Sequence, residues 1–353
     1  VSKRAPDLVP DSPTELRQDE ELPPLPDLTP VAPLELASRL KWIDSYTSLS
    51  RRVGAGRGAA VESAVDGRSL RDDDSDEEQA APMVLLRGGK ITGSAFHEVM
   101  EAISARTVVN GSVLDFGGLA ALDTPDKVLD SPFGELIRGR MDAFGIPNTR
   151  VTINDVPDSA AHRFASLVMN ATRTTLATDG ELARRICDIP SCRTLPEVEF
   201  YMSESFGDRV PAWRRGLLNG LIDMVFELDG RYWFLDWKTT TPDLARGGVS
   251  VEAWQGDSLR VTMSRHGYDI QSRIYALAML RWLRQRHGAC AESMFGGGLF
   301  LFVRGMTAPG LGVWIDRFEG TGDAGMRIED EVADLLSRGA AASRVARREV
   351  GLD

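Results

Sequence analysis

The chain contains 353 residues, 42% of them hydrophobic, and its formal net charge is −11 at pH 7. This length accommodates one large domain or two smaller ones, and the hydrophobic fraction is typical of a globular protein with a sizeable core. No stretch approaches the roughly 18 apolar residues of a membrane span, and the N-terminus lacks a signal-peptide core, so we expect a cytoplasmic protein. Cys187, Cys192 and Cys290 are too few for a disulfide framework or a four-cysteine metal site.

Residues 1–82 carry −7 of the net charge and show little apolar periodicity. An acidic balance alone counts against a nucleic-acid partner, but here it lies mostly in the segment least expected to fold. Residues 51–82 include the acidic stretch 72–78 and predict a disordered surface loop, with a DNA-mimicking lid as the alternative. The expected organisation is a Pro- and acid-rich linker over 1–33, a domain over 34–340 and a polar tail over 341–353.

Beyond residue 83, helical and strand periodicities follow one another along the chain. Helices are predicted from Thr92 onward and over 132–144, 160–177, 270–287 and 328–336; strands are predicted over 198–202 and 298–303. This order of elements favours an α/β fold with a mixed sheet.

Two further apolar runs flank Asp229-Gly230, a strong signal for a two-residue hairpin. Such a turn places Leu228 opposite Arg231, and therefore Asp223 opposite Asp236, with Cβ atoms about 4.5–5.5 Å apart. Lys238 is expected on the same face as Asp236, because side chains alternate along a strand. The other face is expected to carry Ile222, Met224, Phe226, Leu228, Trp233, Leu235 and Trp237.

Two carboxylates facing each other destabilise a sheet unless a cation lies between them. Asp223 and Asp236, with water and a phosphate oxygen, suit Mg²⁺, which prefers oxygen ligands. An ammonium group on the same face, from Lys238, can hold a phosphate or orient the attacking water. The pattern therefore points to metal-assisted hydrolysis of a phosphodiester. The alternative is a surface hairpin in which Asp236 and Lys238 form a solvated ion pair.

The hairpin and its neighbours resemble the C-terminal nuclease domain of the RecB family, within the PD-(D/E)xK nuclease superfamily. The similarity extends over about 42–306 and includes the blocks KWIDSYTSLS, GSAFHEVME, EVEFYM, GLIDMVFELDGRYWFLDWKTT, YDIQSRIYALAMLRWLR and GGGLFLFVRGM. It implies a restriction-endonuclease-like core: a mixed central sheet with a β-hairpin active site, flanked by helices.

The resemblance assigns roles to residues of the hairpin and of the preceding helix. It implies that His97, Asp223 and Asp236 bind the metal together with the backbone carbonyl of Trp237, and that Lys238 is catalytic. Taken without the resemblance, His97 would be an ordinary helix histidine. The implied cofactor is Mg²⁺, with Mn²⁺ as a second acceptable ion and Ca²⁺ as a non-productive occupant.

Three further residues match family positions with less specific roles. Glu199 is expected either to support the site or hold a second metal, or to be a surface carboxylate. Gln271 and Tyr275 lie four residues apart, hence on one helical face, and the resemblance implies that they border the site and position DNA. As a plain helix pair, they would be packing residues.

The resemblance implies a metal-dependent DNA exonuclease of the exodeoxyribonuclease V type, acting in double-strand-break repair and recombination. An upstream helicase motor and RecC- and RecD-like subunits would feed single-stranded DNA to the site. The printed sequence has no Gly-x-x-x-x-Gly-Lys-[Ser/Thr] loop, so we expect it to be the nuclease portion of a longer protein. The alternatives are a stand-alone RecB-like exonuclease, a nuclease-dead scaffold that guides DNA, and a restriction-type endonuclease.

Overall fold

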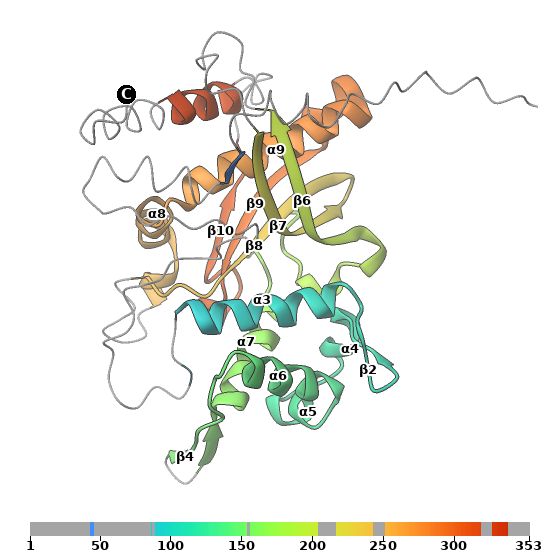
Figure 1. Ribbon diagram of the computed structural model, residues 1–353, viewed down its shortest axis with the longest axis vertical. Helices are drawn as coiled ribbons and strands as arrows, with labels where there is room; N and C mark the ends of the chain where they lie inside the picture. Colours follow the sequence, from blue (N-terminus) through green and yellow to red (C-terminus); the bar gives the residue numbers. More distant parts are fainter. Residues whose placement is uncertain are drawn as a thin grey trace, which may run out of the picture. The chain divides into compact units, whose positions relative to one another are not determined.

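Figure 1 shows the computed structural model of the protein. The structure describes the backbone of 43–45 and the residues 86, 89–153, 156–203, 217–242, 251–318 and 327–337. The predicted linker (1–33), acidic loop (51–82) and polar tail (341–353) lie outside the described residues. Among the described residues, none of the helices has both the length and the hydropathy that crossing a membrane requires.

The centre of the fold is a six-stranded mixed sheet in the order β1-β7-β8-β9-β10, with β6 paired along β7. The β8–β9 and β1–β7 pairs are parallel, and the other pairs are antiparallel. The strands are β1 (Ile43–Ser45), β6 (Thr194–Ser203), β7 (Leu217–Leu228), β8 (Arg231–Lys238), β9 (Phe295–Phe302) and β10 (Val313–Asp316). The predicted α/β class with a mixed central sheet is confirmed.

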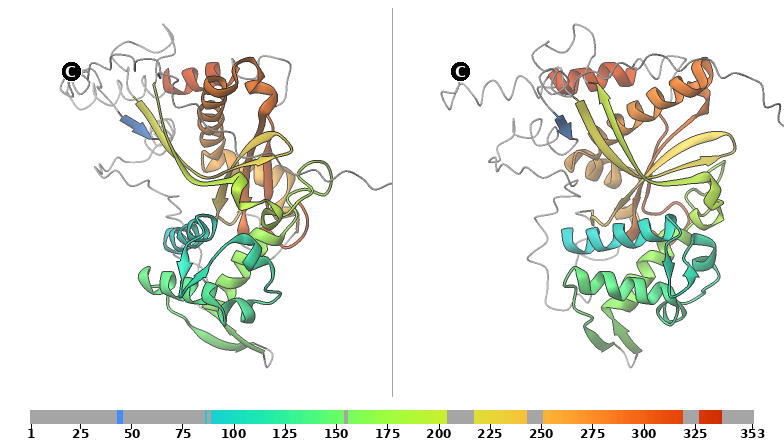
Figure 2. Two further views of the ribbon diagram at one scale, coloured as in Figure 1. Left: turned by 90° about the vertical axis from the view of Figure 1, so that its right-hand side faces the viewer. Right: turned by 45° about the vertical axis from the view of Figure 1, so that its right-hand side comes forward.

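Helices lie on both sides of this sheet (Figure 2). Each group of helices packs on the sheet around its own hydrophobic core. One group contains α3 (Lys90–Ser104), α4 (Phe116–Ala120), α5 (Pro125–Leu129), α6 (Pro132–Ala143) and α7 (Ala160–Arg173). The other contains α8 (Gly256–Arg265), α9 (Tyr268–His287) and a helix over 327–337. The smaller elements are β2 (Val108–Val109), β3 (Ser112–Val113), β4 (Arg150–Ile153), β5 (Val156–Ser159) and α10 (Ala291–Met294).

The β7–β8 hairpin forms as predicted. Asp229 and Gly230 have φ values of 50° and 81°, the left-handed conformation that a tight hairpin turn requires. The register then runs from Leu228 opposite Arg231 up to Met224 opposite Leu235. It stops one pair short of Asp223 and Asp236, so the two strands separate at the predicted carboxylate pair.

The face predicted for the apolar hairpin residues is confirmed except at Ile222. Met224 packs in the core with α3, together with Trp237 and the others, whereas Ile222 packs in the core with α9. Strand β7 therefore changes the face that it presents at Asp223. On β6, Glu197 stands opposite this position and has a φ of 47°, which interrupts the regular ladder between the two strands.

Strand β6 extends beyond its predicted range of 198–202 at both ends. The boundaries of α7 and β9 also differ from their predictions, and both involve contacts with segments distant in the sequence. Helix α7 ends at Arg173 instead of 177 because Thr174 is extended, with its hydroxyl donating to the Met306 carbonyl at 2.8 Å. Strand β9 begins three residues before the predicted Gly298. A Cβ added at Gly298 would lie 2.1 Å from the Phe234 ring, so this glycine makes room for an aromatic side chain of β8.

Candidate active site

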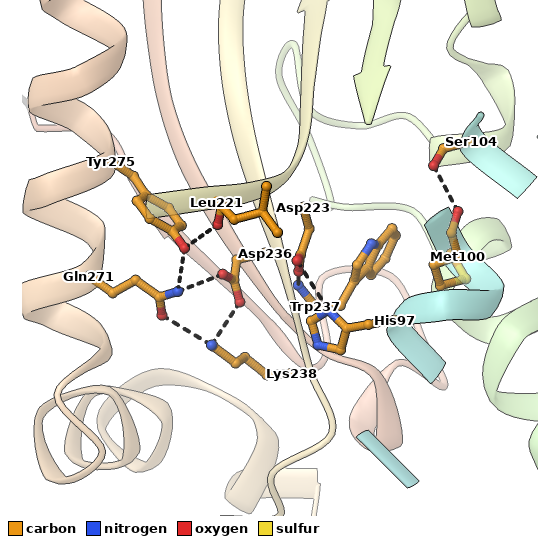
Figure 3. A network of polar contacts seen from close by, with 10 residues as sticks. All are labelled: His97, Met100, Ser104, Leu221, Asp223, Asp236, Trp237, Lys238, Gln271 and Tyr275. Atoms are coloured by element: carbon orange, nitrogen blue, oxygen red, sulfur yellow. Dashed lines mark hydrogen bonds and ion pairs between the residues drawn. The ribbon is translucent and has the colours of Figure 1, made fainter. Parts of the chain in front are cut away.

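The predicted side chains from α3, the hairpin and α9 meet where β7 leaves β8 (Figure 3). The site has two halves, named here for the helices that complete them. The α3 half consists of His97, Asp223 and the backbone N–H of Trp237. The α9 half consists of Asp236, Lys238, Gln271 and Tyr275.

In the α3 half, the Asp223 carboxylate joins a helix to a strand. Its Oδ1 lies 3.1 Å from His97 Nδ1, and its Oδ2 accepts a hydrogen bond of 2.7 Å from the N–H of Trp237. Burial by itself would raise the pKa of Asp223, but His97, the Trp237 N–H and Lys238 together hold this pKa below its ordinary value. Asp223 is therefore ionised at neutral pH, with both of its oxygens in contact with nitrogen atoms of His97 and Trp237.

The position of His97 follows from the packing of α3. Phe96 and Val99 on this helix are fully buried in the core, which fixes the rotation of the helix against the sheet. At Gly93, an added Cβ would lie 2.9 Å from Thr239 Oγ1. The absence of a side chain at Gly93 thus lets the first turn of α3 approach the residue that follows Lys238.

In the α9 half, Lys238 is the centre of a buried polar network. Its Nζ lies 2.8 Å from Asp236 Oδ2 and donates to Gln271 Oε1 at 3.0 Å. The side chains of Lys238 and Asp236 are only 2% and 4% exposed. The alternative of a solvated surface pair is therefore wrong.

Gln271 links both members of this ion pair to Tyr275. Its Nε2 donates to Asp236 Oδ1 at 2.8 Å and lies 2.9 Å from the Tyr275 hydroxyl, which donates in turn to the Leu221 carbonyl. Burial, and then the two aspartates, raise the pKa of Tyr275 well above its ordinary value, so the hydroxyl keeps its proton. Gln271 and Tyr275 are only 5% and 4% exposed. Their contacts with the ion pair and with β7 are therefore buried inside the protein.

The structure does not bring Glu199 into either half. Glu199 is exposed on β6, where it accepts a hydrogen bond of 2.5 Å from the Tyr201 hydroxyl. No described hydrogen bond connects it to the other predicted site residues. Its surroundings are those of a surface carboxylate, and its supporting role stays a prediction.

Sequence reasoning missed Tyr268 and the two threonines that follow Lys238. The ring centroid of Tyr268 lies 4.0 Å from Lys238 Nζ, and its hydroxyl is 2.7 Å from Thr240 Oγ1. The carbonyl of Thr239 accepts a hydrogen bond of 3.0 Å from Arg304. One available signal was the spacing of Tyr268 and Gln271, which are three residues apart on α9 and therefore share a face.

The donor atoms of the site are of the kinds that Mg²⁺ and Mn²⁺ accept: carboxylate oxygens and an imidazole nitrogen. Among the described residues, no three or more His, Cys, Asp or Glu side chains converge as a ready metal cage. The carboxylate of Asp223 contacts His97, and that of Asp236 contacts Lys238 and Gln271. The donor set thus fits a divalent cation, provided that these carboxylates change partners when it binds.

Comparison with known proteins agrees with the family resemblance over part of the chain. No family model matches. Over 93 residues, or 26% of its length, the chain is 39% identical to the RecBCD enzyme subunit RecB of Escherichia coli strain K12. The chain carries a RecB-like domain.

The RecB-like domain also matches RecB subunits of other bacteria. It is 35% identical over 106 residues to the RecB subunit of Haemophilus influenzae, and 30% identical over 97 residues to that of Mycolicibacterium smegmatis. These matches cover 29% and 27% of the chain. The matched segments are 8% of the length of the E. coli and H. influenzae subunits and 9% of the M. smegmatis subunit, so the chain spans only a small part of these relatives.

Proposed function

We propose that the RecB-like domain is a divalent-metal-dependent DNA nuclease that hydrolyses phosphodiester bonds. The observation that carries this proposal is the meeting of His97, Asp223, Asp236 and Lys238 in one buried site. It combines metal-type donors with an ammonium group, the combination that metal-assisted phosphodiester hydrolysis requires.

In this proposal, His97, Asp223 and Asp236 hold the metal, with the Trp237 carbonyl as a further donor. A bound Mg²⁺ would supply Lewis-acid activation of the scissile phosphate and of the attacking water. The Trp237 N–H orients the Asp223 carboxylate through its hydrogen bond of 2.7 Å. Asp236 and Gln271 orient Lys238, and in the proposed reaction its charge would stabilise the negative charge that develops as the phosphate reacts.

The substrate and partners that we propose follow the RecB family. The RecB-like domain would act as an exonuclease on single strands supplied by a helicase motor, with RecC- and RecD-like subunits, in double-strand-break repair and recombination. Because the chain is acidic overall, DNA would follow a local basic path, and its affinity would fall steeply as salt concentration rises.

The test is a digestion of linear and covalently closed single-stranded DNA with Mg²⁺, Mn²⁺, Ca²⁺ or EDTA. We expect cleavage of the linear form with Mg²⁺ and Mn²⁺ but not with Ca²⁺, because the looser coordination of Ca²⁺ places the water poorly. Asp223→Asn should be inactive, whereas Asp123→Asn is the matched control, because Asp123 is an exposed aspartate paired with Lys127.

Three outcomes would contradict the proposal or change it. Equal cleavage by both aspartate variants would place the activity outside this site. Cleavage of closed circles at the linear rate would favour an endonuclease over an exonuclease. Metal-dependent DNA binding without cleavage would favour a scaffold that guides DNA.

A further inference from the structure

We propose that Tyr268 is a positioning residue for Lys238, holding its ammonium group in place for catalysis through the face of its aromatic ring. The proposal rests on the nuclease function proposed above. The ring centroid of Tyr268 lies 4.0 Å from Lys238 Nζ, well within the range of a cation–π interaction, and the ring centroid of Phe300 is 5.8 Å from the same nitrogen. Lys238 is only 2% exposed, so this interaction is shielded from water. Cation–π interactions are stronger when water is excluded.

The orientation of the Tyr268 ring is fixed on several sides. The rings of His266 and Phe300 lie almost parallel to it, at interplanar angles of 17° and 18°. Its hydroxyl is 2.7 Å from Thr240 Oγ1, two residues beyond Lys238. Tyr268 therefore ties the first residue of α9 to the end of β8 and presents a rigid surface to the ammonium group.

The contact between the Tyr268 ring and Lys238 is important because Asp236 has two competing roles. In this structure its carboxylate contacts Lys238, but in the proposed reaction the same carboxylate binds a cation. A cation bound there would weaken the hold of Asp236 on Lys238. The Tyr268 ring attracts the ammonium without adding another carboxylate, so it can keep Lys238 in place while Asp236 changes partner.

Two variants separate the ring from the hydroxyl. Tyr268→Phe keeps the ring and removes the hydrogen bond to Thr240, and its single-turnover cleavage rate should stay within about threefold of the parent rate. Tyr268→Leu removes the ring, and its rate should fall on the order of 10-fold, while DNA and metal affinities stay within about twofold. Phe295→Leu is the matched control, because Phe295 lies in the same core but contacts the rings of Phe234 and Phe318.

Lysine NMR provides a readout that is independent of catalysis. The chain has five lysines, so lysine-selective ¹³C labelling gives five ε-methylene signals, from Lys3, Lys41, Lys90, Lys127 and Lys238. The Lys238 signal, assigned by its loss in Lys238→Arg, should be shifted upfield by the ring current of Tyr268. The shift should persist in Tyr268→Phe and largely disappear in Tyr268→Leu.

Several results would overturn the inference. An unshifted Lys238 signal in the parent chain would do so even if Tyr268→Leu failed to fold. Three cleavage results would also overturn it. Tyr268→Leu could cleave at the parent rate, Tyr268→Phe could be as slow as Tyr268→Leu, or Phe295→Leu could be as slow as Tyr268→Leu. A parent chain that cleaves no DNA with any divalent metal would overturn the proposed function, and the inference with it. An active parent with an equally active Tyr268→Leu would overturn only the role of Tyr268.

Discussion

The α3 half and the α9 half of the site differ in how tightly their side chains are held. In the α3 half, Asp223 is held by His97 and by one backbone N–H, and the strands separate beside it. In the α9 half, Lys238 and Asp236 share Gln271, and Tyr275 anchors that amide to β7. The difference indicates that the two halves have different roles. The α3 half can rearrange around a cation, whereas the α9 half holds Lys238 in a fixed place even when Asp236 changes partner.

The largest effects should come from removing either carboxylate. Asp223→Ala and Asp236→Ala should both lose measurable cleavage and most metal affinity, as judged by single-turnover assays and calorimetry. Their stabilities should differ, because Asp236→Ala leaves the buried Lys238 without this carboxylate, at a cost of about 3–5 kcal/mol. Asp223→Ala should cost less, about 1–3 kcal/mol, because it removes an acceptor from an imidazole and from one backbone N–H and not from a buried ammonium group. Equal losses in urea unfolding would contradict the contrast between the halves.

A smaller effect is expected from Lys238→Ala. The cleavage rate should fall by roughly 10²–10³, which is typical when one preorganised electrostatic group is removed. Metal affinity should be unchanged or slightly higher, because a nearby positive charge is lost, and DNA binding should change much less. Lys127→Ala is the control, since Lys127 is 61% exposed on α5. Cleavage by Lys238→Ala at the parent rate, with both aspartate variants inactive, would remove Lys238 from the mechanism.

Gly93→Ala tests how closely α3 must approach the hairpin. An alanine Cβ would lie 2.9 Å from Thr239 Oγ1, so the helix or the threonine must shift. We expect a cleavage rate about 10-fold lower, because small displacements of reacting groups are costly. Gly139→Ala on α6 is the matched control: its Cβ would meet nothing within 4 Å, and it should stabilise the protein by about 0.5–1 kcal/mol. Parent-like cleavage by Gly93→Ala would show that the α3 half tolerates displacement.

The smallest effect concerns Asp316 on β10, which accepts a hydrogen bond of 2.9 Å from Ser272 behind the α9 half. Burial raises the pKa of Asp316, against the opposing effects of Ser272 and Arg273. The stability that this proton contributes is fully present below the unfolded pKa of about 3.9 and is lost as pH rises through the folded value.

Asp316→Asn keeps an acceptor for Ser272 and carries no charge. Its stability relative to the parent should therefore improve from about pH 3.5 to pH 7, as measured by urea unfolding. The stability of Asp123→Asn relative to the parent should instead decrease over this pH range, because the hydrogen bond from Lys127 lowers the pKa of Asp123. If the difference in unfolding free energy between Asp316→Asn and the parent did not depend on pH, the raised pKa of Asp316 would be contradicted.

Local chemistry made much of the fold predictable. The Asp229-Gly230 turn set the hairpin register, since a two-residue turn leaves the strands only one pairing. Buried residues at helical spacing located α3 and α9, and the spacing of Gln271 and Tyr275 placed them on one face. These features depend on residues near one another in the sequence, where backbone geometry alone restricts the outcome.

Tertiary packing decided what the two aspartates contact. The sequence predicted that Asp223 and Asp236 face each other, but the ladder ends before them, and helices on opposite faces of the sheet supply their partners. Three further features could not be predicted from the sequence: the left-handed conformation of Glu197, the contact of Tyr268 with Lys238, and the close approach of Gly93 to Thr239. Each depends on segments distant in sequence that meet only when the two cores pack, and no local pattern encodes such a meeting.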